Sequence, residues 1–183
     1  AEGKDVLVLA AGEPDFDTPI NIRKAASKAM DAGQTRYVPG KGTPALQKAI
    51  QSKFLKDNNL HYDLDEIIVG VGGKHIIYNA MMATINPNDE VIIPAPFWVS
   101  YPDIVLLAEG KPIIVQCPES QNFKITADQL EKNITDKTKW LMLNSPSNPT
   151  GSLYSKKELK ELADVLLRHP NVLIMSDDIY EKV

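Results

Sequence analysis

Residues 140–151 read Trp140-Leu141-Met142-Leu143-Asn144-Ser145-Pro146-Ser147-Asn148-Pro149-Thr150-Gly151. The first four form an apolar run that does not alternate with polar residues, which is typical of a strand buried on both faces. The residues that follow favour turns, so the chain is expected to change direction directly after the strand. A buried strand that runs into a polar turn is typical of a parallel sheet covered by helices, and this stretch therefore predicts an α/β fold.

Four more apolar runs have the same character, since each is short and rich in branched side chains. They are Ile67–Val71, Val91–Ile93, Pro112–Val115 and Val172–Met175. Segments with helical spacing of apolar residues lie between these runs. We therefore expect a three-layer sandwich in which helices cover both faces of a mostly parallel sheet.

Helix start signals separate the strands. Some pair threonine with a following proline, which is an N-cap before a proline in the first turn, and others are capping boxes. One helix is expected from its apolar spacing alone, beginning near Lys74. The expected starts are Thr18-Pro19, Thr43-Pro44, Lys74, Thr126 with Gln129, and Ser155 with Glu158.

The composition excludes several classes of protein. The chain has 183 residues, 43% of them hydrophobic and 24% charged, which is globular composition of roughly one-domain size. Its net charge of −4 weighs against nucleic acid as a partner. Cys117 is the only cysteine and the histidines are scattered, so no metal site is expected. No apolar run approaches the roughly 20 residues that span a membrane, and residues 1–5 do not resemble a secretory signal, so a cytoplasmic location is expected.

Three of the apolar runs end in glycine or polar residues. The segments that follow them are Gly72-Gly73-Lys74, Asn144–Gly151 and Ser176-Asp177-Asp178-Ile179-Tyr180. Ligands of open α/β sheets bind outside the carboxyl ends of the strands, so these segments suggest one shared pocket. Each signal alone leaves an alternative open. The glycines could form a phosphate site or a plain tight turn, and Asp177 could contact a ligand, cap a helix or form a buried ion pair.

The order of the motifs is more specific than any one of them. Along the chain come Ala11–Pro19, Arg36-Tyr37 before Gly40-Lys41-Gly42, Gly72-Gly73-Lys74, Pro96–Pro102, Asn148–Gly151 and Asp177–Tyr180. This series resembles the class I/II pyridoxal-phosphate aminotransferases of fold type I, and is most similar to the bacterial aspartate and aspartate/prephenate branch. The resemblance covers essentially the whole chain.

The resemblance implies roles around the cofactor pyridoxal 5'-phosphate. Asp177 matches the residue that meets the pyridine nitrogen, and Tyr180 matches the one that bonds the phenolic oxygen; these two are the expected catalytic residues. Asn148 matches a residue that shares that oxygen and reaches the substrate carboxylate. Trp98 matches the aromatic that stacks on the ring, beside the substrate.

The remaining implied contacts concern the phosphate, the substrate and a second subunit. Gly73 and Lys74 match phosphate-binding positions, and Lys74 also matches a lysine that pairs with the distal carboxylate of the substrate. Gly12 matches a backbone contact near the substrate carboxylate. Tyr37 matches a tyrosine that reaches the phosphate of the neighbouring subunit, which implies a homodimer with shared sites. His75 stands where many relatives have glutamine, and the resemblance assigns it no role.

The resemblance also implies that the chain is a fragment. The Schiff-base lysine of the family lies in a later motif than the aspartate motif, and Lys182 is too close to Asp177 to match it. Residues 1–19 are expected to be a segment linked to the small domain, and residues 20–183 part of the cofactor-binding large domain. The expected activity, amino transfer between aspartate and 2-oxoglutarate, belongs to the full-length protein, and the fragment alone is expected to be inactive.

Three other interpretations stay open. The first is a different aminotransferase or a lyase of the same fold. The second is a non-catalytic module that binds pyridoxal phosphate in a regulator. The third is a nucleotide-binding doubly wound domain, which His75 disfavours because it replaces the last glycine of the dinucleotide fingerprint. The resemblance itself predicts cis peptide bonds before Pro96 and Pro149, where a cis bond has a prior of about 5–6%.

Overall fold

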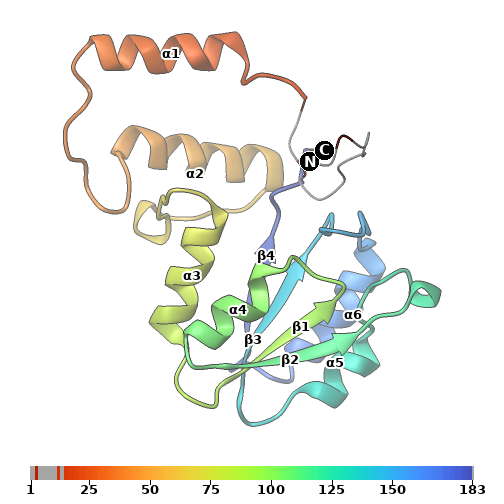
Figure 1. Ribbon diagram of the computed structural model, residues 1–183. Helices are drawn as coiled ribbons and strands as arrows, with labels where there is room; N and C mark the ends of the chain where they lie inside the picture. The colour runs from red at the N-terminus through yellow and green to blue at the C-terminus, as the bar shows by residue number, and fades with distance from the viewer. Residues whose placement is uncertain (1–2, 4–11, 13–14, 183) are drawn as a thin grey trace. The chain divides into compact units, whose positions relative to one another are not determined.

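The computed structural model describes residues 3, 12 and 15–182 (Figure 1). The chain divides into two compact units, residues 1–68 and 69–183. The expected domain boundary after residue 19 stays a prediction, because most residues on its N-terminal side lie outside the described ones. Each unit is described below by itself.

The first unit contains two helices, α1 (Ile20–Asp31) and α2 (Pro44–Asn58), and the short 3₁₀-helix η1 (Leu64–Glu66). The cap of α2 is as predicted, since the Thr43 hydroxyl accepts a hydrogen bond from the Leu46 N–H at 3.3 Å. The predicted cap of α1 is wrong: the N-cap position falls on Pro19 and no side chain caps this helix. Gln47 joins α2 to the η1 segment, because its buried amide donates to the carbonyls of Leu64 and Ile67.

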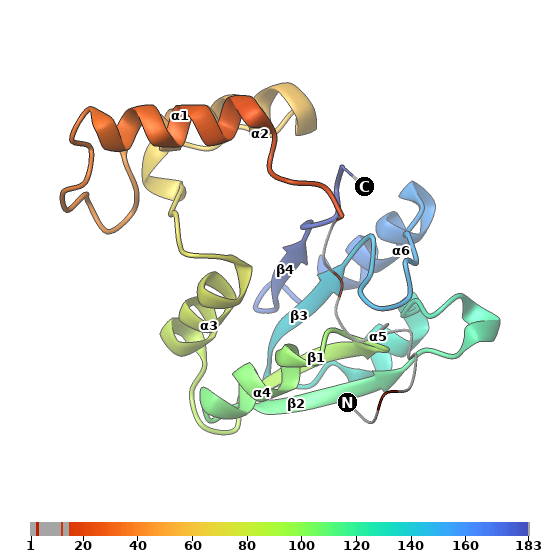
Figure 2. The same cartoon turned by 45° about the horizontal axis from the view of Figure 1, so that its top comes forward.

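The second unit is built on a four-stranded sheet in the order β2-β1-β3-β4, in which every neighbouring pair is parallel. Its strands are β1 (Glu90–Ala95), β2 (Lys111–Gln116), β3 (Thr138–Asn144) and β4 (Leu173–Asp177). Its helices are α3 (Gly73–Thr84), α4 (Ser100–Leu107), α5 (Ala127–Asn133) and α6 (Lys156–Leu166), with the 3₁₀-helix η2 (Glu119–Gln121). Because the strands are parallel, their carboxyl ends share one edge of the sheet (Figure 2).

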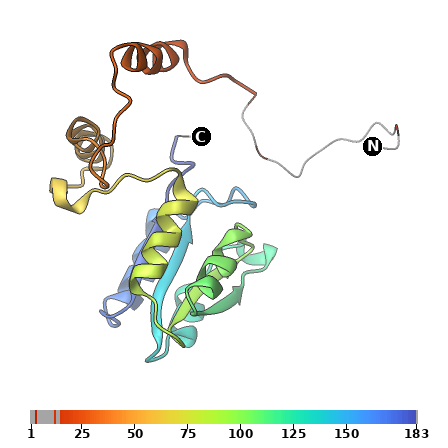
Figure 3. The same ribbon diagram turned by 60° about the vertical axis from the view of Figure 1, so that its left-hand side comes forward.

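Helices cover both faces of this sheet, as the sequence predicted. The helices α3 and α4 lie on one face, and α5 and α6 on the other (Figure 3). Successive side chains of a strand point to opposite faces, so each inner strand contributes to two cores. Val91 and Ile93 of β1 pack under α3 and α4, whereas Ile92 packs under α5 and α6. The three-layer α/β class is therefore confirmed.

Two predictions about strands are wrong. Residues 67–71 pair with no strand among the described residues, although the backbone of Ile67 is extended. The runs in β2 and β4 are not buried on both faces, because these are the edge strands and their cover is partial. Leu173 and Ile174 of β4 are 40% and 52% exposed, while the inner strands β1 and β3 are largely buried.

Three predicted helix starts in this unit agree with the structure to within one residue. Both capping boxes are present, with Thr126 and Gln129 at α5 and Ser155 and Glu158 at α6. Helix α3 begins at Gly73, one residue before the expected start. Helix α4 was not predicted, and no side chain caps its start.

Candidate active site

The predicted site residues of the second unit gather at the carboxyl edge of the sheet. Asp177 is the last residue of β4 and stands in register with Asn144, the last residue of β3. Trp98 lies between the end of β1 and the start of α4, and Lys74 lies in the first turn of α3. The topology therefore brings together three strand ends and one helix N-terminus, as expected for a ligand site of an open α/β sheet.

Tyr101 of α4 holds the carboxylate of Asp177 in place. The Tyr101 hydroxyl donates to Asp177 Oδ2 at 2.7 Å, and the N–H of Ile179 donates to Oδ1 at 3.3 Å. Only 3% of Tyr101 is exposed. Burial, together with the neighbouring Asp177 carboxylate, raises the pKa of the Tyr101 phenol, so the phenol keeps its proton and remains a donor at neutral pH. Asp177 is thus the last residue of a strand rather than a helix cap, and its carboxylate accepts from a phenol rather than from a cation.

Asn148 and Tyr180 lie next to each other, beside the end of β4. The amide Nδ2 of Asn148 is 3.5 Å from the Tyr180 hydroxyl, at the outer limit of a hydrogen bond. Both side chains are partly buried. Two donors that converge loosely in this way could share one acceptor oxygen of a ligand, which is the arrangement that the resemblance implied.

The Asn144 side chain connects two of the strand-end segments. Its Nδ2 donates to the main-chain oxygen of Asp177 at 2.7 Å, and its Oδ1 accepts from the N–H of Asn148 at 2.7 Å. The turn that follows Asn144 contains cis bonds before Pro146 and Pro149, and a third cis bond precedes Pro96. The cis bonds predicted before Pro96 and Pro149 are confirmed, whereas the one before Pro146 was not predicted.

Trp98 has neighbours on its ring face and at its edge. The ring of Tyr101 lies at 5.5 Å in a T-shaped arrangement with an interplanar angle of 86°. The ammonium of Lys74 lies 4.9 Å from the centroid of the Trp98 ring, within the range of a cation–π contact. Lys74 therefore presents a positive charge beside the aromatic residue that was expected to stack on a ligand.

The N-terminus of α3 has the features of an anion site. The first-turn N–H groups of a helix have no acceptor within it, and this first turn contains no acidic residue. Gly72 adopts a φ of 95°, and the space where a Cβ of Gly72 or Gly73 would lie is open. His75 connects the helix to the segment that precedes it, because its Nδ1 accepts a hydrogen bond from the Val71 N–H at 3.3 Å. This geometry favours the phosphate interpretation over a plain turn.

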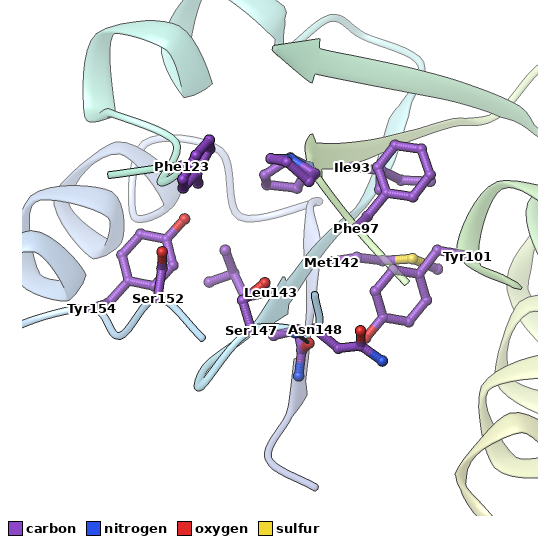
Figure 4. A pocket seen from close by; sticks show the side chains of 13 residues that line it. Ile93, Phe97, Tyr101, Phe123, Met142, Leu143, Ser147, Asn148, Ser152 and Tyr154 are labelled. Atoms are coloured by element: carbon purple, nitrogen blue, oxygen red, sulfur yellow. Dashed lines mark hydrogen bonds between the residues drawn. The ribbon is translucent and has the colours of Figure 1, made fainter. Parts of the chain in front are cut away.

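A pocket opens at the carboxyl ends of β1 and β3 (Figure 4). Its lining includes Tyr101, Asn144 and Asn148 of the candidate site, but not Asp177, Tyr180, Trp98 or Lys74. On its far side lie Phe123, Ser152 and Tyr154. The pocket therefore adjoins the predicted site and shares part of its wall, because Tyr101 lines the pocket and also donates to Asp177.

Two predicted site residues belong to the other unit. Tyr37 is fully exposed, and Gly12 is exposed as well. Both lie in the unit of residues 1–68, so their roles at the site stay predictions. Over the described ranges, no group of histidine, cysteine and carboxylate side chains could hold a metal ion. None of the described helices is long and apolar enough to cross a membrane.

Sequence reasoning missed two residues of the site, Tyr101 and Asn144. Both stand inside quoted motifs, but neither received a role. Asn144 is the first polar residue after a buried strand, and that position was a usable signal. Tyr101 lies one helical turn after Trp98, but only the fold shows that it faces the end of β4, 76 residues away in sequence.

The fold and site together define an α/β protein with a ligand site at the carboxyl edge of a parallel sheet. The chain belongs to the aminotransferase class I and II family, whose model matches residues 4–183. A protein of Rickettsia bellii named probable aspartate/prephenate aminotransferase is 60% identical over 181 residues, which are 99% of this chain and 45% of that protein. The aspartate aminotransferase of Rhizobium meliloti is 53% identical over 182 residues, 100% of this chain and 44% of that protein.

Solved structures agree with this assignment. The crystal structure of the Rhizobium meliloti aspartate aminotransferase superposes with a TM-score of 0.95 at 54% identity, covering 97% of this chain and 44% of that one. The aspartate aminotransferase of Thermus thermophilus with maleate gives a TM-score of 0.91 at 40% identity, covering 96% of this chain and 46% of that one. The chain thus spans less than half the length of these relatives.

Proposed function

We propose that the complete protein containing this chain is a pyridoxal-phosphate-dependent aminotransferase that moves the amino group between aspartate and 2-oxoglutarate. The observation that carries the proposal is the carboxylate of Asp177, fixed by Tyr101 at a strand end with Asn148 and Tyr180 beside it. Membership of the aminotransferase family supports it. The names of the relatives support aspartate as the amino donor.

The residues present fit pyridoxal phosphate. The phosphate would lie at the N-terminus of α3, where open space beside Gly72 and Gly73 admits an anion and the first helical turn carries no acidic residue. The carboxylate of Asp177 would face the pyridine nitrogen, with Tyr101 holding it from behind. When bound, the cofactor supplies an electron-withdrawing ring that stabilises negative charge at the substrate Cα.

The side chains of the site would make separate interactions with the cofactor. Asp177 holds a proton on the pyridine nitrogen, because a fixed carboxylate in a partly buried site favours the cationic ring. Asn148 and Tyr180 donate to the phenolic oxygen and so fix the rotation of the ring. Trp98 covers one ring face and limits the access of water.

Lys74 would select the substrate. Its ammonium lies over the Trp98 ring and has no acidic partner among the described residues, so it can pair with a distal carboxylate of the substrate. Maleate, which was present in the Thermus thermophilus structure, is a four-carbon dicarboxylate like the carbon skeleton of aspartate. A dicarboxylate substrate is therefore the chemistry that this cation favours.

The proposal extends to assembly and location. We place residues 1–19 with the small domain and residues 20–183 in the large cofactor-binding domain. Tyr37, which is fully exposed in its own unit, is free to reach the phosphate of a neighbouring subunit in a homodimer, and Gly12 would contact the substrate carboxylate. The enzyme would act in the cytoplasm.

A steady-state assay of the complete protein tests this function. Aspartate and 2-oxoglutarate are supplied with added pyridoxal phosphate, and oxaloacetate is measured with malate dehydrogenase and NADH. Asp177→Asn is expected to remove most of the turnover. The matched control is Asp178→Asn, because the exposed Asp178 accepts from the Ser176 hydroxyl and does not contact Tyr101. No turnover by the wild type, or equal losses in the two variants, would contradict the proposal.

A further inference from the structure

Asn144 joins two parts of the site that the proposed function uses separately. One is the end of β4, which carries Asp177, and the other is the turn that carries Asn148. The Asn144 side chain contacts the main chain of both at 2.7 Å, and neither contact involves a catalytic side chain directly. Asn144 itself needs no contact with a ligand to influence both residues.

The chemistry of the two contacts requires an amide. The Asp177 carbonyl can only accept a hydrogen bond, and the Asn148 N–H can only donate one. These partners fix which end of the Asn144 amide points to each of them. Aspartate at this position would keep an acceptor for Asn148 but lose the donor to Asp177, and an apolar residue would supply neither.

The location makes both contacts difficult to replace. Asn144 is partly buried, and its bonds bridge residues that are separated by 29 positions in sequence, Asn148 and Asp177. Among the described residues, the only other side-chain contact between this turn and the segment at the end of β4 is the loose 3.5 Å pair of Asn148 and Tyr180. The Asn144 side chain thus links the Asn148 turn to the end of β4, in addition to the main-chain pairing of β3 with β4.

We infer that Asn144 is a positioning residue that sets the spacing between Asp177 and Asn148. This inference rests on the proposed function, in which Asp177 meets the ring nitrogen and Asn148 the phenolic oxygen of one rigid ring. Such a ring has a fixed width, so its two contacts must be held at a matching separation. Asn144 meets that requirement through its bonds to the main chain of Asp177 and of Asn148.

The test uses the complete protein and measures cofactor binding as well as turnover. Pyridoxal phosphate is titrated into the cofactor-free protein and followed by the quenching of tryptophan fluorescence. Two ordinary hydrogen bonds are lost in Asn144→Ala, so we expect its Kd for pyridoxal phosphate to rise by about tenfold and kcat to fall by a similar factor. Asn144→Asp is expected to show the same kcat loss, because the donor to Asp177 is gone.

The matched control is Asn133→Ala. Asn133 also donates from its side chain to a main-chain oxygen, that of Gln129 at 2.8 Å, but it lies in α5 away from the candidate site. Asn133→Ala is expected to lower the melting temperature without a change in the Kd for pyridoxal phosphate. If Asn144→Ala lowers stability equally and leaves Kd and kcat within twofold of the wild type, the positioning role is wrong.

A double-mutant cycle separates positioning from general loss of structure. If Asn144 acts by placing the Asn148 side chain, part of its effect on kcat/KM must vanish in the background of Asn148→Ala. Additive effects would overturn the inference. Should Asn144→Ala fail to fold, Asn144→Asp carries the same cycle. A wild-type protein that binds no pyridoxal phosphate would instead refute the proposed function, and the two failures are therefore distinguishable.

Discussion

Replacing Tyr101 by phenylalanine removes the hydroxyl that donates to Asp177 Oδ2 and leaves the ring in place. The ring contacts of Tyr101, including the T-shaped contact with Trp98, do not depend on the hydroxyl. The substitution removes only the hydroxyl from this buried side chain, so no large cavity forms and the measurement isolates the hydrogen bond. The carboxylate then keeps only the longer contact from the Ile179 N–H.

The expected cost follows from the type of bond. A hydrogen bond to a charged group contributes about 1.5–3 kcal/mol to stability, and the lower end applies here because Asp177 is only partly buried and water can replace the donor. We therefore expect the free energy of unfolding to fall by about 1.5 kcal/mol at neutral pH. In the complete protein we expect kcat/KM to fall by roughly tenfold or more, since about 1.4 kcal/mol corresponds to tenfold.

The pH dependence supplies a second signature. The pKa of the Tyr101 phenol is raised in the folded chain by burial and by Asp177. In the unfolded chain the pKa of a tyrosine is about 10. Because the pKa is higher in the folded chain, the protonated phenol stabilises the fold below pH 10, and this stabilisation is lost as the pH rises above that value. In alkaline solution the free energy of unfolding of Tyr101→Phe is therefore expected to fall less steeply with pH than that of the wild type. Tyr154, whose pKa burial raises to about 12, keeps its own contribution in both proteins.

Urea denaturation of the 183-residue chain measures both effects, with the fluorescence of Trp98 and Trp140 as the signal. Tyr78→Phe is the matched control, because Tyr78 is 38% exposed and its hydroxyl makes no hydrogen bond with the described residues. If Tyr101→Phe and Tyr78→Phe differ by less than about 0.5 kcal/mol, the range of ordinary surface substitutions, then the Tyr101 hydroxyl does not fix Asp177.

Three further predictions concern other parts of the molecule. Asp177→Ala in the complete protein is expected to leave the fold intact and to lower kcat by more than about tenfold, a barrier change above ~1.4 kcal/mol, and a smaller loss in the oxaloacetate assay would exclude Asp177 as the partner of the ring nitrogen. Lys74→Ala is expected to raise KM for aspartate more than KM for phenylalanine, because only aspartate has a distal carboxylate; equal changes would remove Lys74 from substrate selection. Hydrogen bonding to Lys124 lowers the pKa of Glu158 from 4.5 to about 2. The ionised Glu158 therefore stabilises the folded chain above pH 4.5, and this stabilisation is lost as the pH falls toward 2. Urea denaturation of Glu158→Gln is expected to show a smaller change in the free energy of unfolding over this pH range.

Local signals in the sequence predicted most of the second unit. The apolar runs in β1 and β3 identify inner strands because both of their faces are buried, and the capping boxes of α5 and α6 identify helix starts because they satisfy local N–H groups. Both depend on neighbours in sequence. Ile67–Val71 has the same apolar character, yet a strand also needs a partner strand, and the composition of a run does not supply one.

The candidate site divides in the same way. Asp177, Asn148 and Lys74 stand at strand ends or a helix start, so their positions follow from the order of elements. Tyr101 and Asn144 act through contacts between elements that are distant in sequence, and these depend on the parallel order β1-β3-β4 and on how α4 lies against it. Residue types and spacing do not specify such contacts.

In the proposed function, the strand ends of the second unit hold pyridoxal phosphate for amino transfer from aspartate. The most direct measurement is the amount of oxaloacetate formed when the complete protein, loaded with pyridoxal phosphate, receives aspartate alone. Amino transfer predicts about one equivalent of oxaloacetate per bound cofactor and then no more until 2-oxoglutarate is added. Continuous formation of product without 2-oxoglutarate, or no oxaloacetate from a loaded protein, would contradict the proposed function.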